Sequence, residues 1–250
     1  MKPVLPFIMA GSPDLGKLPS FLAEASELKL DAIEVGLPHS DPIADGPALQ
    51  AAAQQAIAAG VTPMAVIRKL AGCSPSAPVV LFTYLNPLLQ IGSKRLIELL
   101  RPTPVRSLLI VDLPFGEEPE FEAELRAAGY PVVPLLAPTT DLERAARLLA
   151  ERPDPGDGAP FAQRFAYVVA RLGVTGTGQP SDLAPVRTRV AELRRITSRP
   201  LAVGFGLSDA ASLDAVRTMG AVPVVGSALV TALQGGQSLR EALTVLGGKS

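Results

Sequence analysis

Two acidic side chains in one short stretch, Glu34 and Asp45, are the residues of this chain best suited to acid–base chemistry. Glu34 lies in an apolar run of Ala, Ile and Val typical of a buried strand, where a carboxyl group is costly unless it is paired or used. Asp45 follows in a loop rich in Pro, Gly and Asp. Two carboxyl groups in one pocket can differ in protonation at neutral pH, so one can donate a proton while the other stays ionised.

Each acid also has a structural interpretation. Glu34 can be a buried acid paired with Arg or Tyr, and Asp41 and Asp45 can be turn or helix-capping residues, because Asp before Gly or Pro is common in turns. For Asp41 we favour the structural interpretation. Asp112 ends a later apolar run, and we expect it to form a hydrogen bond to a neighbouring loop.

Glycines gather at the ends of the last three strand-like runs, in Gly173–Gly176, in Gly204–Gly206 and at Gly226. Glycine lets backbone N–H groups approach an anion closely, and the N-terminus of a following helix adds a positive field. Residues 227–233 could form such a helix. One glycine alone is weak evidence, but their joint position predicts a phosphate site.

Residue types that are missing narrow the chemistry further. No lysine lies at an expected strand end, which disfavours a Schiff-base aldolase, and the single histidine, His39, cannot form a histidine-rich metal site. We find no convincing Ser–His–Asp set and no dinucleotide-binding glycine fingerprint. Carboxylate chemistry on a small phosphate ester remains, without a metal or cofactor in this chain. Arg171 could clamp the anion or form a surface ion pair.

Strand-like and helix-like segments alternate along the whole chain. We expect strands over residues 5–10, 32–36, 79–85, 108–112, 132–137, 165–170, 201–205 and 222–226. We expect helices over residues 18–28, 47–59, 93–100, 119–128, 141–150, 182–196, 209–219 and 239–246. Unbroken apolar runs suit strands buried on both faces. Eight such units predict an α/β fold, a (β/α)8 TIM barrel with residues 1–250 as a single domain. A doubly wound open sheet is the competing architecture.

Composition excludes several other classes of protein. Of the 250 residues, 48% are hydrophobic and 19% charged, which is enough for a large core. The net charge is −1 and no basic run appears, so we expect no nucleic-acid partner. No apolar stretch is long enough for a membrane span, and the first residues do not resemble a signal peptide. With Cys73 as the only cysteine, we expect a cytoplasmic protein.

The most specific motif is the acid loop Glu34–Pro47, EVGLPHSDPIADGP, which resembles the tryptophan synthase alpha subunit family. The resemblance continues in order through Pro6-Phe7, Tyr84–Pro87, Asp112–Pro114, Gly173–Gly176, Gly204–Gly206 and Gly226–Ala228. The family is a (β/α)8 barrel and a lyase of tryptophan biosynthesis, which cleaves indole-3-glycerol phosphate to indole and glyceraldehyde 3-phosphate. The resemblance implies the same fold and activity here.

The resemblance also implies roles for individual residues. Glu34 corresponds to the family's catalytic glutamate and Asp45 to its catalytic aspartate. The residues implied near the substrate or the closing loop are Phe7, Tyr84, Leu109, Leu136, Tyr167 and Thr175. Those implied around the phosphate are Gly176, Phe205, Gly206, Gly226 and Ser227. Residues 173–181 correspond to a mobile lid, whose glycines suit hinges. Both tyrosines can equally be barrel-packing residues.

A partner is implied as well. The family's alpha subunit joins a beta subunit in an α2β2 heterotetramer, and the beta subunit holds pyridoxal phosphate, so the cofactor would belong to the partner. The loop after the second strand and residues 84–89 correspond to the docking surface. Two other functions stay open: another phosphate-binding barrel enzyme, and a non-catalytic subunit that only activates a beta partner.

The chain departs from the family pattern in four places. Its first strand begins almost at once, without the N-terminal helix that usually covers the barrel floor, which puts the packing of the floor in question. Ser12 stands where an acid is common, His39 where an aromatic residue is usual, and Leu172 where a small polar residue is often found. We expect none of them to touch the two acids. His39 could alter coupling to the partner, and otherwise we expect His39 and Cys73 to be inert.

Overall fold

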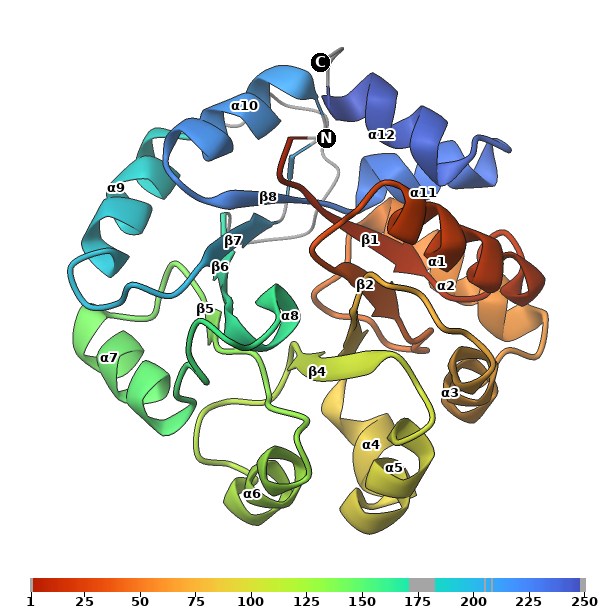
Figure 1. The fold of residues 1–250 in the computed structure, drawn as a ribbon, viewed down its shortest axis with the longest axis horizontal. Coiled ribbons are helices and arrows are strands. Elements are labelled where there is room, and N and C mark those ends of the chain that lie inside the picture. The colour runs from red at the N-terminus through yellow and green to blue at the C-terminus, as the bar shows by residue number, and fades with distance from the viewer. Residues whose placement is uncertain (1, 171–182, 205, 208, 248–250) are drawn as a thin grey trace.

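The structure, a computed structural model, describes residues 2–170, 183–204, 206–207 and 209–247. Within these ranges, eight strands form one parallel sheet in the order β4-β3-β2-β1-β8-β7-β6-β5. The strands are β1 Leu5–Met9, β2 Ile33–Gly36, β3 Val79–Thr83, β4 Val105–Ile110, β5 Leu135–Leu136, β6 Ala166–Val169, β7 Leu201–Gly204 and β8 Val222–Val225. The sheet curls into a ring (Figure 1), so the predicted barrel is confirmed and the open sheet is not.

The seam of the barrel lies between β4 and β5. A single bridge joins Leu108 to Val132, with Leu108 N–H donating to Pro131 O at 3.1 Å and Val133 N–H donating to Leu108 O at 2.8 Å. Pro134 follows and has no N–H with which to continue a ladder. The expected strand over residues 132–137 is therefore reduced to the two residues of β5, and the barrel is nearly closed.

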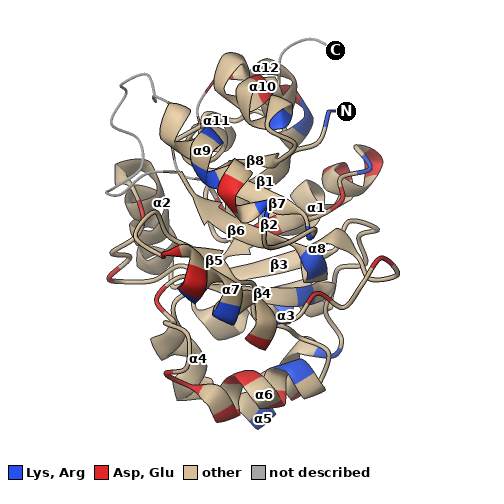
Figure 2. Ribbon diagram, turned by 90° about the vertical axis from the view of Figure 1, so that its left-hand side faces the viewer, with Lys and Arg blue, Asp and Glu red and all other residues tan. Residues whose placement is uncertain are grey.

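Helices surround the ring of strands. They are α1 Leu18–Glu27, α2 Pro47–Ala58, α3 Pro63–Ala71, α4 Leu85–Ile91, α5 Ser93–Leu100, α6 Pro119–Ala127, α7 Leu142–Glu151, α8 Phe161–Arg164, α9 Ala184–Leu193, α10 Ala210–Thr218, α11 Ser227–Gln234 and α12 Leu239–Gly247, with a 3-10 turn at Leu15–Lys17. Figure 2 shows that charged residues gather on these helices and loops, whereas the strands are mostly uncharged.

Three of these helices were not predicted from the sequence. Thr62 caps α3 by accepting a hydrogen bond from Ala65 N–H at 3.2 Å, and a proline follows it at the first helical position. The strand expected over residues 79–85 ends at Thr83, and α4 begins at Leu85. The third, α8, forms in the stretch before β6.

Side chains alternate across the strands and build two apolar layers. The interior layer contains Leu5, Phe7, Met9, Val80, Phe82, Leu109, Val133, Phe165, Tyr167, Ala202 and Val224. The outer layer, between strands and helices, contains Ile8, Ile33, Val35, Leu81, Leu108, Ile110, Leu136, Val168, Val203 and Val225. Because both faces are covered, the strands read as continuous apolar runs in the sequence.

The floor of the barrel, at the amino ends of the strands, is covered by α8. Ala162 and Phe165 belong to the interior layer, and the Ser107 hydroxyl at the start of β4 donates to Ala162 O. Gln163 Nε2 donates to Arg106 O at 3.1 Å and to Gly129 O at 3.0 Å. The sequence left open what covers this end of the barrel, and this short helix does so.

Buried arginines tie the segment around α8 to the helices beside it. Arg152 is 7% exposed and forms a two-pronged ion pair with Glu122 of α6. Arg199 donates to Arg164 O at 2.6 Å and to Arg152 O at 2.8 Å. The proline- and glycine-rich segment 153–158 is therefore anchored at both sides, with Asp154 paired to Arg164 at 3.1 Å.

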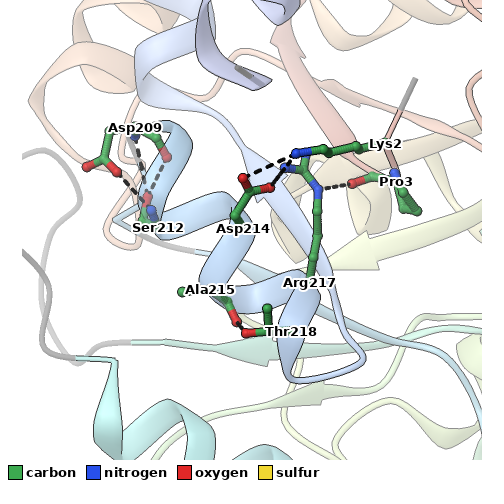
Figure 3. Close-up of polar contacts among 8 residues, drawn as sticks. All are labelled: Lys2, Pro3, Asp209, Ser212, Asp214, Ala215, Arg217 and Thr218. Carbon is green, nitrogen blue, oxygen red and sulfur yellow. Dashed lines mark hydrogen bonds and ion pairs between the residues drawn. The ribbon is translucent and has the colours of Figure 1, made fainter. Parts of the chain in front are cut away.

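The chain before β1 is fastened to α10 (Figure 3). Arg217 donates to Pro3 O at 3.0 Å, and Lys2 pairs with Asp214 at 3.3 Å. The helix begins with a capping box in which Asp209 and Ser212 exchange hydrogen bonds. The Lys2–Asp214 pair is about half exposed and contributes little stability, so β1 is held beside β8 mainly by the strand pairing of Leu5 with Val224.

Candidate active site

Glu34 points into the barrel from the middle of β2. In register it lies beside Phe7 of β1 and Val80 of β3, on the interior face with Ala32. The residue is 1% exposed, and neither carboxyl oxygen has a hydrogen-bond partner within the described part of the chain. Burial alone raises the pKa of Glu34 to about 8. The alternative of a structural acid paired with Arg or Tyr finds no such partner among the described residues.

Two aromatic rings line the interior beside glycines. A β-carbon built on Gly36 would lie 2.5 Å from the Phe7 ring, and one built on Gly204 would lie 1.8 Å from the Tyr167 hydroxyl oxygen. Each glycine thus leaves room for the ring of the adjacent strand. For Gly204, whose segment was assigned to a phosphate site, contact with the Tyr167 ring is sufficient reason for a glycine.

Asp45 reaches the same region from the loop between β2 and α2. It is 2% exposed, its N–H donates to Pro42 O at 3.0 Å, and Gln50 Nε2 donates to its backbone oxygen at 3.0 Å. Burial raises the pKa of Asp45 to about 6, and a hydrogen bond with the Tyr84 side chain counteracts part of that rise. Oδ1 is buried without a hydrogen-bond partner in the described structure.

Tyr84 links the loops that follow β2, β3 and β4. Its hydroxyl accepts a hydrogen bond from Ala44 N–H at 3.1 Å and forms the bond to Asp45. Burial raises the pKa of Tyr84, and the charge of Asp45 adds to the rise. Leu85 N–H donates to Asp112 Oδ1 at 2.7 Å, which confirms the predicted hydrogen bond from Asp112 to a neighbouring loop.

Tyr167 interacts electrostatically with both acids. It is 3% exposed in the interior layer, and burial raises its pKa well above the usual value. The charge of Glu34 is the next largest cause and that of Asp45 follows, so the two carboxyl groups and this phenol share one region of low dielectric. Among the described residues, no lysine or arginine offsets the burial of either carboxyl group.

The two predicted leucines lie on opposite sides of the barrel wall. Leu109 pairs with Phe82 and belongs to the interior layer. Leu136 pairs with Val168 and belongs to the outer layer, whereas Leu135 pairs with Tyr167 and contacts the interior layer. The geometry therefore does not support Leu136 as a substrate contact. Because side chains alternate, a shift of one residue along β5 reverses the side that each leucine faces.

The predicted phosphate residues are described only in part. Gly206 has a φ of 95°, a backbone conformation that favours glycine. Gly226 precedes α11, and Ser227 is its first residue. A β-carbon on Gly226 would lie no closer than 3.8 Å to other atoms, so packing within the described protein does not require glycine there. Five residues named from the sequence, Arg171, Leu172, Thr175, Gly176 and Phe205, and the lid assigned to 173–181, lie outside the described residues.

The sequence interpretation missed one contact of the site. His39 was expected to be inert, yet its ring stacks on Tyr84 with centroids 4.7 Å apart and planes at 21°. Only the position of His39 in the acid loop hinted at this contact, because the two residues are far apart in the sequence.

Neither metal ligation nor a membrane span is evident in the described segments. They contain no group of three or more His, Cys, Asp or Glu residues placed to hold a metal ion. None of the described helices is both long and apolar enough to cross a membrane.

Comparisons with known proteins agree along nearly the whole chain. The profile of the family described as "Tryptophan synthase alpha chain" matches residues 2–246. The tryptophan synthase alpha chain of Gloeobacter violaceus is 40% identical over 232 residues, covering 92% of this chain and 80% of that protein. The alpha chain of Burkholderia pseudomallei is 34% identical over 249 residues, covering 98% of this chain and 88% of that protein.

Solved structures show the same likeness. A mutant tryptophan synthase alpha-subunit from Pyrococcus furiosus superposes with a TM-score of 0.83 at 28% identity, covering 98% of this chain and 97% of that one. A chain from the tryptophan synthase a2b2 complex of Pyrococcus furiosus superposes with a TM-score of 0.81 at 30% identity, covering 96% of this chain and 93% of that one.

Proposed function

Since this chain belongs to the tryptophan synthase alpha chain family, whose subunit cleaves indole-3-glycerol phosphate in tryptophan biosynthesis, we propose that Glu34 and Asp45 carry out this reaction. The observation that carries the proposal is the pair of buried carboxyl groups with pKa values of about 8 and about 6. At neutral pH the first holds a proton and the second is ionised, as acid–base chemistry in one pocket requires. We also propose that residues 1–250 form one domain.

Glu34 transfers protons in two steps. Its carboxyl group first donates a proton to C3 of the indole ring, which leaves the ring positively charged. The resulting carboxylate then takes the proton of the glycerol hydroxyl, the bond between C3 and the side chain breaks, and its electron pair returns to the indole ring. The products are neutral indole and the aldehyde glyceraldehyde 3-phosphate. Glu34 ends in the protonated state in which it began.

Asp45 stabilises the charge that forms between these steps. The positive ring strengthens the indole N–H as a donor, and an ionised Asp45 accepts its hydrogen bond. A group that binds the charged intermediate more strongly than the substrate lowers the barrier instead of only tightening binding. Oδ1 of Asp45, buried without a protein hydrogen-bond partner in the described residues, supports this role.

The remaining contacts follow from position in the barrel. Phe7, Tyr84, Leu109 and Tyr167 surround the indole ring and the glycerol chain, and Leu135 takes the place assigned from the sequence to Leu136. We assign the phosphate to the carboxyl ends of the last strands, where Gly206, Gly226 and Ser227 lie. The family resemblance adds Thr175, Gly176 and Phe205, which lie outside the described residues. Glycine at 226, where packing within the described protein does not require it, supports close approach of an anion.

We further propose a beta-subunit partner in an α2β2 assembly, with pyridoxal phosphate held by that partner. One similar structure is described as an a2b2 complex. Ile43, in the loop after β2, is 70% exposed, and Leu89 of α4 is 42% exposed. These large apolar side chains lie on the two segments predicted as the docking surface, which supports that placement. A biosynthetic enzyme with one cysteine is expected in the cytoplasm.

Turnover of indole-3-glycerol phosphate by the isolated chain tests the catalytic proposal. Glu34→Gln should retain the fold and lower kcat by about 10³-fold or more, because the proton carrier is gone. Glu98→Gln, the same change on the exposed face of α5, is the matched control and should behave as wild type. Retention of more than about a tenth of kcat by Glu34→Gln would contradict the assignment. A folded wild-type chain without turnover, alone or with a beta subunit, would favour the non-catalytic alternative.

The docking surface is tested by co-purification with a beta subunit. Leu89→Asp should weaken the complex, because it places a charge in an apolar contact. Val245→Asp, on α12 at 71% exposure, is the control and should leave the complex intact. Equal effects of the two changes would argue against this placement.

A further inference from the structure

We propose that His39 is a positioning residue that orients the carboxylate of Asp45 through the side chain of Tyr84. The proposal rests on the role proposed above for Asp45. His39 lies in the loop between β2 and α2, and its half-buried ring stacks on the Tyr84 ring at 4.7 Å and 21°. Stacking at this centroid distance is an attractive arrangement for two planar rings.

Three contacts fix the position of Tyr84, and a side chain fixed in this way can orient another side chain. His39 covers one face of its ring, Ala44 N–H donates to its hydroxyl at 3.1 Å, and Asp112 accepts from the next backbone N–H at 2.7 Å. A phenol hydroxyl has one hydrogen to donate. With its oxygen accepting from Ala44, the residue before Asp45, the hydroxyl lies beside the Asp45 carboxyl group, and its interaction with that group lowers the pKa of Asp45.

Asp45 needs such support because it lies on a loop and not on a strand. Its backbone is held by Pro42 and Gln50, but neither of these contacts orients the carboxylate. Ser40, Asp41 and Ile43 of the same loop are exposed, so the loop is packed on its inner side only. On this inner side, the Tyr84 ring stacks on His39, which precedes the exposed residues in the chain. The Tyr84 hydroxyl interacts with Asp45, which follows them.

The alternative is that His39 merely fills space on the loop. Filling space and orienting Asp45 predict different kinetics. A space filler alters stability and leaves the proton chemistry unchanged, whereas a positioning residue alters kcat and the pH at which Asp45 ionises. Among the described residues, the ionisable groups that interact with Asp45 are Tyr84, from the loop after β3, and Tyr167, inside the barrel. Glu34 acts on Tyr167 and Asp112 acts on Tyr84, and all four groups are present in every His39 variant.

Kinetics of the full chain on indole-3-glycerol phosphate provide the first test. His39→Ala should lower kcat about two- to tenfold, the factor that matches the loss of one ring contact, with a smaller change in KM. The acid limb of the pH profile should move to higher pH, because the Tyr84 hydrogen bond that lowers the pKa of Asp45 weakens. His39→Phe should restore most of kcat, because Phe retains a stacked ring. Glu98→Ala, on the exposed face of α5, is the control.

A double variant and a titration decide the mechanism. In a Tyr84→Phe background, His39→Ala should have little further effect on kcat, because both changes act on one chain of contacts. Carbon NMR of the labelled Asp45 carboxyl group, without substrate, should show its pKa raised in His39→Ala. A full effect of His39→Ala in the Tyr84→Phe background, or an unchanged Asp45 titration, would overturn the proposal. If Asp45→Asn kept full turnover while the titration still moved, the proposed function would fail and the positioning role would stand.

Discussion

Glu34 and Asp45 are buried to nearly the same degree but are held in opposite ways. Glu34 is fixed by its backbone, which pairs with β1 on one side and β3 on the other, and its side chain has no hydrogen bond within the described residues. Asp45 lies on a loop, where its carboxylate is bound by Tyr84. The main chain of Glu34 is fixed within the sheet and its side chain is unbound, whereas Asp45 lies on a loop whose backbone contacts leave its carboxylate to be oriented by Tyr84.

Because of this difference, the two acids differ in their pKa values and in how much their positions depend on the surroundings. Burial raises both pKa values, but the hydrogen bond from Tyr84 lowers that of Asp45, so they differ by about two pH units, at about 8 and about 6. The strand gives Glu34 one position, while the loop lets the position of Asp45 depend on its surroundings. A partner that orders the loop would therefore act on Asp45 and leave Glu34 unchanged.

The largest expected effect concerns the two acids directly. Asp45→Asn should lower basal kcat about 10²-fold, less than Glu34→Gln, because it removes charge stabilisation and not the proton carrier. It should also reduce the activation ratio, kcat with a beta subunit divided by kcat without it. Asp31→Asn, the same change at an exposed position before β2 and outside the predicted docking surface, is the control. A wild-type activation ratio in Asp45→Asn would leave Asp45 with a purely chemical role.

Stability should depend on pH through Glu34. Its folded pKa of about 8 exceeds the ordinary 4.5, so between these values the folded state binds a proton that the unfolded state has released. The contribution of Glu34 to the free energy of unfolding is therefore fully present below about pH 4.5. It is lost as the pH rises towards about 8, by on the order of a few kcal/mol. Between about pH 7 and 8, where Asp45 is mostly ionised, denaturant unfolding of Glu34→Gln should be nearly independent of pH. An equal slope in both proteins would contradict the raised pKa of Glu34.

Activity should follow a bell-shaped pH profile. The reaction needs Asp45 ionised and Glu34 protonated, so kcat/KM should fall below about pH 6 and above about pH 8. Each limb falls tenfold per pH unit well outside the bell. Asp45→Asn should remove the acid limb and retain the base limb. Loss of the base limb in that variant would mean that the two acids titrate as a coupled pair.

The smallest effect is expected for Tyr84→Phe, which removes only the hydroxyl. This variant retains the ring under His39 but loses the hydrogen bond to Asp45. We expect kcat to fall about tenfold or less, and the acid limb to shift to higher pH with the base limb in place. Tyr130→Phe, away from the acids near Arg101 and Arg106, is the matched control. A shift of the base limb would show that Tyr84 acts on Glu34 as well.

Much of this molecule is readable from the sequence because its signals are local. Eight apolar runs alternating with helical segments predict a barrel, since strands covered on both faces must be apolar throughout. An acid inside one of those runs stands out for the same reason, which is why Glu34 is identifiable from the amino-acid order alone. Asp112 is readable as a loop contact because it directly ends an apolar run.

Other features depend on contacts that no local pattern encodes. Whether Leu135 or Leu136 faces the interior is decided by the register of a two-residue strand beside β6. Covering of the barrel floor by α8 depends on contacts with β4, more than 50 residues earlier in the chain.

The electrostatics of the site also arise from the tertiary structure. The amino-acid sequence predicts the barrel and identifies the two acids. Which acid keeps its proton is set by the fold, because a pKa depends on burial and on the hydrogen bonds each carboxyl group finds in space. Tyr84 interacts with Asp45 although it lies 39 residues further along the chain. His39, from the loop after β2, stacks on Tyr84, which follows the neighbouring strand β3. Parallel strands bring their carboxyl ends together at one edge of the barrel, and that convergence turns separate loops into one site.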